Sequence, residues 1–242
     1  MRLVREWRGG AIEGLIFTAS TETRIENAGS RDIVHYVRMQ TFGGCMKQKK
    51  HPRCYVVAGP NGAGKTTFAL KYLPLIASCH NFVNADEIAK GLSPLDYNAG
   101  LLKAGKIFLD TLKQKIAQRS DFAFETTLSG RAYLPQIAAW RKSGWRVVLF
   151  YLYIPNAEFS AMRVQQRVLQ GGHNIPPEDI DRRFPRSVRN LFDYAEVCDH
   201  TLCIDNTGDQ IVSIFEKRFG QPIRIHDIER FSILQGVLSN ER

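Results

Sequence analysis

Several features of metal, disulfide and membrane proteins are missing from this chain of 242 residues. Its five cysteines form no C-x-x-C pair and no His/Cys cluster with zinc spacing, which excludes a zinc finger and a disulfide scaffold. The longest apolar run, residues 147–154, is far too short to span a bilayer. Internal repeats and low-complexity runs are also missing. We therefore expect reduced thiols, a cytoplasmic location and no membrane partner.

Acidic residues are the minority charge in this chain. The sequence has 33 Lys/Arg against 24 Asp/Glu, a formal net charge of +9. Residues 1–50 hold nine Lys/Arg and five Asp/Glu, so the excess is spread along the chain and no basic block dominates. A protein that binds polyphosphates needs positive charge around its site, so this excess does not by itself indicate nucleic acid. We expect nucleic acid not to be the partner.

The chain length suits one α/β domain with a small appendage. Residues 1–45 have few apolar residues at regular spacing, which predicts a poorly structured N-terminal extension before a domain spanning 46–242. Met39 and Met46 lie close upstream of the first strong strand. Two interpretations stay open here: translation begins at one of these methionines, or the extension is a flexible regulatory arm.

The strongest motif is CYVVAGPNGAGKTT at residues 54–67, which fits the phosphate-binding pattern G-x-x-x-x-G-K-[ST]. Glycines bring backbone N–H groups close to a polyphosphate, and Lys65 can reach its β and γ phosphates. Thr66 offers a hydroxyl to Mg²⁺ beside the positive end of a helix. An apolar strand at 55–58 and a helix at 66–73, closed by Pro74, supply the required context. The sequence therefore predicts ATP and Mg²⁺ as cofactors, bound by Gly59, Pro60, Asn61, Gly62, Ala63, Gly64, Lys65, Thr66 and Thr67.

Two carboxylates follow predicted strands. Asp86 comes after a short second strand that includes Phe82 and Val83, and Glu125 directly follows a third strand at 122–124. Asp86 has two interpretations of roughly equal weight. It could cap the next helix by accepting its first free N–H groups. It could also act at the ligand site, which in open α/β sheets lies beyond the carboxyl ends of the strands.

The remaining predicted elements complete an α/β pattern. A continuously apolar fourth strand, typical of a buried parallel sheet, ends without the acidic pair that a transporter or helicase ATPase would need there. The other elements are packing helices at 96–119 and 134–142, the fourth strand at 145–153, a fifth strand at 200–204, a closing helix beginning with Ile211 and Phe215, and a short strand and helix after Gly220.

Arginines gather on two predicted helices around a turn at residues 171–177. Arg163 and Arg167 are four residues apart before it, and Arg182 and Arg183 follow it. Arginines on a closing segment can stabilise the charge that develops during phosphoryl transfer while excluding water, so we favour a lid over about 157–191. The alternative is two solvated helical faces. His173 in the turn is interpreted as structural rather than catalytic.

The ordered set of motifs resembles the zeta-toxin family of P-loop kinases, and especially its short bacterial members. The resemblance covers about residues 52–210 and rests on GPNGAGKTT, VNADEI, FAFETTLSG, IPN, RVLQGGHNIPPEDIDRRF and IDNTG. It implies an α/β P-loop fold similar to nucleoside monophosphate kinases, with a central parallel five-stranded sheet, helices on both faces and a helical lid. It also implies transfer of the ATP γ-phosphate to a hydroxyl, which in the best-known members is on UDP-N-acetylglucosamine.

The resemblance also implies roles for single residues. Lys65 and Thr66 would hold the phosphates and Mg²⁺, and Asp86 matches the general base towards the substrate hydroxyl. Glu125 and Thr127 match the E-x-T segment that contacts the acceptor. The lid arginines would be Arg163 or Arg167 together with Arg182 or Arg183, and Arg131 is the nearest match to an arginine that follows the E-x-T segment.

Two features depart from the family pattern: Ser129 lies where toxin members usually carry that arginine, and the GGH-x-IP turn is unlike theirs. The function predicted is an ATP-dependent kinase that phosphorylates a hydroxyl of a small molecule, with a nucleotide sugar as the candidate acceptor. A protein antitoxin is the candidate partner in a toxin–antitoxin context. The alternative is an ATP-hydrolysing switch or a nucleic-acid-associated P-loop ATPase.

Overall fold

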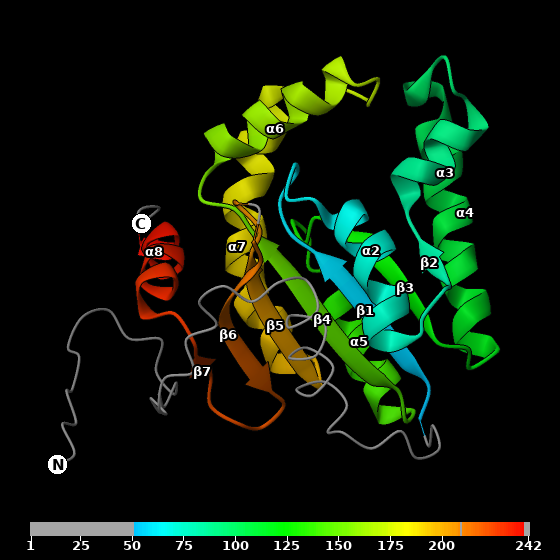
Figure 1. The fold of residues 1–242 in the computed structure, drawn as a ribbon. Helices are drawn as coiled ribbons and strands as arrows, with labels where there is room; N and C mark the ends of the chain where they lie inside the picture. The colour runs from blue at the N-terminus through cyan, green and yellow to red at the C-terminus, as the bar shows by residue number, and fades with distance from the viewer. Residues whose placement is uncertain (1–50, 209, 240–242) are drawn as a thin grey trace, which may run out of the picture.

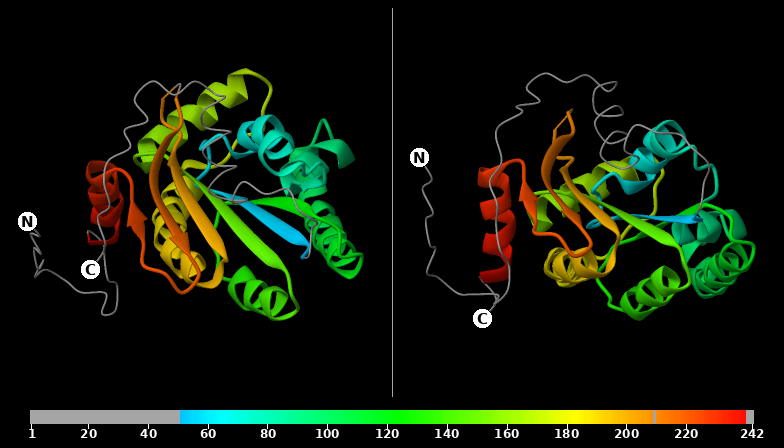
Figure 2. Two further views of the ribbon diagram at one scale, coloured as in Figure 1. Left: turned by 60° about the horizontal axis from the view of Figure 1, so that its bottom comes forward. Right: turned by 90° about the horizontal axis from the view of Figure 1, so that it is seen from below.

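The computed structural model describes residues 51–208 and 210–239. The predicted extension at 1–45 and the alternative starts at Met39 and Met46 lie outside these residues. The described part forms one seven-stranded sheet with helices on both faces (Figures 1 and 2). Its strands are β1 (Arg53–Ala58), β2 (Phe82–Val83), β3 (Phe122–Thr126), β4 (Arg146–Tyr153), β5 (His200–Asp205), β6 (Val212–Arg218) and β7 (Arg224–Ile225).

The helices alternate with the first five strands, as the sequence predicts for an α/β fold. They are α2 (Lys65–Ala77), α3 (Ala85–Leu92), α4 (Tyr97–Ala117), α5 (Tyr133–Lys142), α6 (Ala157–Leu169), α7 (Pro177–Val197) and α8 (Ile228–Ser239). No helix within residues 51–208 and 210–239 is both long and apolar enough to cross a membrane.

The strand order is β2-β3-β1-β4-β5-β6-β7, with β1 to β5 parallel. This confirms the predicted parallel five-stranded sheet, and β6 and β7 extend it in the antiparallel direction. The strand β1, which leads into the phosphate-binding loop (residues 59–67), therefore lies between β3 and β4. The carboxyl ends of these three strands meet at one edge, where a ligand site is expected.

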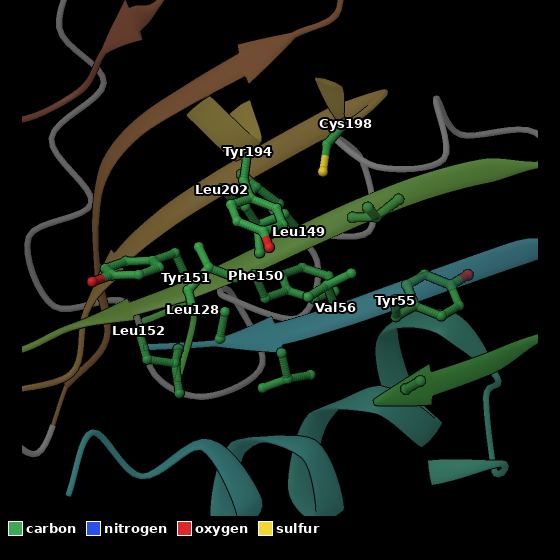
Figure 3. Packing of buried hydrophobic residues seen from close by; sticks show 14 of the residues in the cluster. Tyr55, Val56, Leu128, Leu149, Phe150, Tyr151, Leu152, Tyr194, Cys198 and Leu202 are labelled. Atoms are coloured by element: carbon green, nitrogen blue, oxygen red, sulfur yellow. The ribbon is translucent and has the colours of Figure 1, made fainter. Parts of the chain in front are cut away.

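The core lies on both sides of β1 and β4, whose residues are almost all buried (Figure 3). Neighbouring residues of a strand point to opposite faces. Phe150 packs against Phe68 of α2, with ring centroids 5.5 Å apart, whereas the Tyr151 hydroxyl lies 2.9 Å from that of Ser187 in α7. Figure 2 shows α2 on one face of the sheet and α5 and α7 on the other. The apolar fourth strand is thus buried on both faces, as predicted.

The predicted closing helix beginning with Ile211 and Phe215 is wrong, because Val212–Arg218 is strand β6. This segment pairs with the open edge of β5. Phe215 stacks on Phe192 of α7 and packs at its edge against Phe231 of α8. β-Branched and aromatic residues suit a strand, and the tertiary contacts of this segment decide its conformation. The short strand and helix predicted after Gly220 are confirmed as β7 and α8.

The first helix also differs from its predicted boundary. Pro74 lies inside α2, which continues to Ala77 and ends at Ser78 in a left-handed conformation with φ 49°. A proline in a helix removes one hydrogen bond, here the one to the carbonyl of residue 70. Leu70 is exposed, so water can reach that side of the helix, and the packing of Leu73 and Ile76 in the core holds the last turn.

Candidate active site

The phosphate-binding loop follows β1 and leads into α2. Gly64, the residue before the helix, has φ 79°, and a Cβ there would lie 2.7 Å from Nδ2 of Asn206. Gly59 has φ 145°, and its Cβ would lie 2.3 Å from the Leu152 carbonyl oxygen of β4. The positive φ values and the lack of room for a Cβ therefore both require glycine at these two positions.

Side chains from outside the loop bind its carbonyl groups. The Ser160 hydroxyl donates to the carbonyl of Asn61 at 2.6 Å, and the Asn206 amide donates to that of Ala63 at 2.8 Å. The first N–H groups of α2 have no partner within the helix, so they are available to an anion. The carbonyl groups of the loop are thus bound by protein side chains, whereas the N–H groups at the start of α2 remain available to a phosphate.

Arg163 clamps three segments together. Its guanidinium donates to the carbonyls of Asn206 and Thr207 at 2.8 Å each, and lies 3.5 Å from the carbonyl oxygen of Gly62. The same group stacks over the Phe159 ring at 4.6 Å. Arg163 therefore ties α6 to the phosphate-binding loop and to the loop after β5.

Lys65 and Thr66, at the end of the loop, both contact Glu125 near the end of β3. Nζ of Lys65 donates to the Pro60 carbonyl at 2.9 Å and lies 3.6 Å from Oε1 of Glu125. The Thr66 hydroxyl donates to Oε2 of Glu125 at 2.7 Å, and the Asn84 amide donates to the same oxygen at 2.8 Å. The resemblance assigned Glu125 to the acceptor, whereas the structure places it against Lys65 and Thr66 of the predicted nucleotide site.

A hydroxyl oxygen and a carboxylate oxygen are ligands that Mg²⁺ accepts, so Thr66 and Glu125 fit the predicted ion. Within the described residues there is no group of three or more His, Cys, Asp and Glu side chains that could hold a metal by themselves.

Asp86 lies in the first turn of α3 and is not the cap of that helix. The cap is Asn84, whose side-chain oxygen accepts from the N–H groups of Asp86 at 2.8 Å and Glu87 at 3.4 Å. The capping interpretation of Asp86 is therefore wrong. Its Oδ1 accepts a hydrogen bond of 2.7 Å from the Tyr97 hydroxyl, and its Oδ2 lies 3.8 Å from Nε2 of His173.

A cavity of about 420 Å³ is lined both by Thr66 of the phosphate-binding loop and by Asp86. One wall holds Thr66, another comes from α3, α4 and the turn between them, and a third comes from the end of α6 and the turn after it. Figure 1 shows that turn reaching towards α3 and α4. The lining residues are Thr66, Asp86, Glu87, Lys90, Ser93, Pro94, Leu95, Tyr97, Arg167, Gln170, Gly171, Gly172 and His173.

The sequence and the fold of this chain are similar to those of known proteins. Residues 101–218 match the sequence model described as Zeta toxin, a little under half of the chain. The chain is zeta-toxin-like. The matched region includes Glu125 and the arginine-bearing helices, whereas the phosphate-binding loop and Asp86 lie before it.

One relative and two solved structures show further similarities. An uncharacterized protein of Haemophilus influenzae is 27% identical over 126 residues, which cover 52% of this chain and 88% of that protein. The crystal structure of AvrRxo1-ORF1:-ORF2 with ATP gives a TM-score of 0.59 at 15% identity, covering 84% of this chain and 70% of that one. The PezAT toxin–antitoxin structure from Streptococcus pneumoniae gives 0.51 at 13% identity, covering 90% and 100%. The zeta-toxin-like chain thus shares its fold with these two solved structures.

The four arginines of the predicted lid have different surroundings in this zeta-toxin-like chain. Arg167 lines the cavity and donates to the His173 carbonyl at 3.1 Å, whereas Arg163 is the clamp described above. Arg182 and Arg183 both bind Asp179 on their own helix, at 2.8 Å for Arg183. The hydrogen bond from Arg182 holds the pKa of Asp179 below its ordinary value. The structure therefore brings only Arg167 of the four into the cavity wall.

The loop after β3 carries the other residues that the resemblance assigned to the acceptor. Thr127 and Ser129 share a hydrogen bond of 3.0 Å between their hydroxyls. Arg131 forms an exposed ion pair of 2.9 Å with Asp193 of α7. Neither Thr127 nor Arg131 belongs to the described residues that line the cavity with Asp86.

Sequence reasoning missed Asn84, Tyr97 and Asn206 and treated His173 as structural only. Asn84 stands directly before the helix that carries Asp86, so its capping role had a local signal. The contacts of Tyr97 with Asp86 and of Asn206 with Ala63 had no local signal in the sequence. They join residues that are 11 and 143 positions apart.

Proposed function

We propose that this zeta-toxin-like chain is an ATP-dependent kinase that transfers the γ-phosphoryl group to a hydroxyl group of a small molecule. The cavity of about 420 Å³ carries the proposal, because Thr66 and Asp86 stand on its walls together. A donor phosphate at the phosphate-binding loop and an acceptor hydroxyl at Asp86 would meet in this space.

Lys65 and the N-terminal N–H groups of α2 would bind the phosphates of ATP. In the described structure, Lys65 binds the Pro60 carbonyl and stands 3.6 Å from Glu125, so its ammonium is already held at the loop. Mg²⁺, when bound, neutralises phosphate charge, and Thr66 and Glu125 are the residues that would hold it.

Asp86 would take the proton of the acceptor hydroxyl while that oxygen forms its bond to the γ-phosphorus. The bond from the γ-phosphorus to the bridging oxygen breaks, and ADP leaves with the electron pair. Arg167 faces the same cavity and would stabilise the charge on the transferring group. The segment at about 157–191 would act as the lid that excludes water.

We also propose the finer features of this activity. UDP-N-acetylglucosamine is the first acceptor to test, since the best-known zeta toxins phosphorylate it. A protein antitoxin is a proposed partner, because PezAT is described as a toxin–antitoxin system. A cytoplasmic location agrees with ATP as the donor and with the free thiols of the buried Cys54, Cys198 and Cys203.

A transfer assay with γ-³²P-ATP tests the proposal directly. Purified protein is incubated with UDP-N-acetylglucosamine, other nucleotide sugars or nucleosides, and Lys65→Ala serves as the blank. We expect label on an acceptor that disappears in the blank. Release of free phosphate alone, unchanged by every acceptor, would contradict the kinase and favour an ATP-hydrolysing switch.

A further inference from the structure

Two aromatic side chains from opposite walls of the cavity stack on each other beside Asp86. Tyr97 belongs to α4 and His173 to the turn between α6 and α7. Their ring centroids are 4.0 Å apart and their planes differ by 11°. This stack joins the predicted lid to the part of the fold that carries Asp86.

Each of the two side chains also approaches one oxygen of Asp86. The Tyr97 hydroxyl donates to Oδ1 at 2.7 Å, and Nε2 of His173 lies 3.8 Å from Oδ2. The Asp86 side chain is about half exposed and His173 is largely covered, with 47% and 18% of their side-chain surfaces exposed. The Asp86 carboxylate is therefore contacted by Tyr97 and His173, and its remaining surface is open to the cavity.

The backbone of the turn fixes His173 to α6. Arg167 donates to the His173 carbonyl at 3.1 Å, and the Gly172 N–H donates to the Arg167 carbonyl at 2.9 Å. A Cβ on Gly172 would lie 2.6 Å from Cγ of Arg167, so the close approach requires glycine. His173 and Arg167 consequently move as one unit with the end of α6.

We propose that Tyr97 and His173 are positioning residues that form a latch, which couples closure of the turn at 170–176 to the orientation of the Asp86 carboxylate. Tyr97 binds Oδ1 of Asp86 whether the turn is open or closed. His173 comes close to Oδ2 only when the turn is closed, with the His173 ring stacked on Tyr97 of α4. The inference rests on the proposed role of Asp86 as the base.

The protonation states of the two rings fit this latch. Burial and the hydrogen bond to Asp86 raise the pKa of Tyr97, so its hydroxyl stays a donor at neutral pH. Burial lowers the pKa of His173, although Asp86 opposes this shift. The charged groups that face His173 are Asp86, Glu87 and Lys90 of α3 and Arg167 of α6. A neutral imidazole can orient the Asp86 carboxylate without forming the ion pair by which an imidazolium would compete with the acceptor for it.

The contact can be tested without turnover by titrating the imidazole signals of the full chain by NMR. His173→Gln identifies the His173 signal among the six histidines. Asp86→Asn should lower the pKa of His173, because a nearby carboxylate favours the imidazolium. Asp110→Asn, on the exposed side of α4, is the control and should leave it unchanged. A pKa of His173 that does not respond to Asp86→Asn would overturn the latch.

Kinetics then separate positioning from packing. Tyr97→Phe keeps the ring and removes only the hydroxyl, so we expect kcat to fall by about tenfold with the KM for ATP unchanged. His173→Phe keeps the stack and should retain more activity than His173→Ala. Tyr133→Phe, a half-buried tyrosine on α5, is the matched control. Wild-type kcat and KM in both Tyr97→Phe and His173→Ala, with Asp86→Asn inactive, would overturn the latch and leave the kinase intact.

Discussion

The hydroxyl of Thr66 donates a hydrogen bond of 2.7 Å to Glu125, a residue 59 positions away. The contact exists because β3 pairs with β1, so that Glu125 stands opposite Val57, two residues before the phosphate-binding loop. The Asn84 amide donates to the same carboxylate and fixes it from the other side. We infer that Glu125 acts on the nucleotide side of the site rather than on the acceptor.

Glu125→Gln should therefore change the response to Mg²⁺. The amide oxygen can still accept from Thr66, but it lacks the charge that favours a divalent cation. We expect the Mg²⁺ concentration for half-maximal turnover to rise by about 10–100-fold. Glu158→Gln, an exposed acid at the start of α6, is the control. An unchanged Mg²⁺ dependence would return Glu125 to the acceptor side.

Gly59→Ala should disrupt the phosphate-binding loop. The new methyl group would lie 2.3 Å from the Leu152 carbonyl oxygen, at a φ that L-residues rarely adopt. We expect a lower melting temperature and loss of ATP binding in calorimetry. Gly105→Ala is the matched control, because nothing lies within 4 Å of its Cβ and alanine favours a helix. ATP binding by Gly59→Ala at wild-type affinity would show that the strand and loop can move apart.

The phosphate-binding loop was predictable because its chemistry lies in consecutive residues. Local apolar patterns also predicted the five parallel strands and most helices. The place of Glu125 was not predictable, since it depends on which strand lies beside β1. Strand β6 was missed for a similar reason: its burial comes from Phe192 and Phe231, which are distant in sequence.

Arg163→Ala should weaken both the fold and nucleotide binding. The variant loses the hydrogen bonds to the carbonyls of Asn206 and Thr207 and the contact with the carbonyl of Gly62. These carbonyl groups then lack their charged donor. We expect the free energy of unfolding to fall by about 1–3 kcal/mol in denaturant titrations. Arg182→Ala loses an exposed ion pair and should cost below about 1 kcal/mol. Equal losses in the two variants would contradict the clamp.

The lid arginines illustrate what spacing cannot decide. Arg163 and Arg167 are one helical turn apart, yet one binds backbone carbonyls and the other lines the cavity. Arg182 and Arg183 bind Asp179, an acid in the first turn of their own helix. Which partner an arginine finds depends on the neighbouring segment, and that information comes only from the tertiary structure.

Asp227 should make the start of α8 sensitive to acid. Its carboxylate accepts from the Arg230 N–H at 2.9 Å, and although burial acts to raise its pKa, the bonds and charge of Arg230 hold it below the ordinary value of 3.8. Stability from a lowered carboxylate pKa is complete above the unfolded value and is lost as the pH falls through the folded value.

Asp227→Asn should consequently cost up to about 1 kcal/mol at pH 7, and this difference from the wild type should shrink at pH 3. Thermal unfolding of both proteins at the two pH values measures it. Glu229→Gln in the same turn is the control. A difference that stays constant between the two pH values would mean that the carboxylate charge is not the stabilising feature.

The most direct test of the central claim is Asp86→Asn, assayed for ATP binding and for single-turnover phosphoryl transfer to the acceptor that the labelling experiment identifies. The amide keeps the size of the side chain and removes the proton acceptor. We predict wild-type ATP affinity and a transfer rate lowered by about 10²–10⁴-fold. Asp110→Asn should transfer at the wild-type rate. Wild-type transfer by Asp86→Asn would contradict the account, because the cavity would then hold no base at this position.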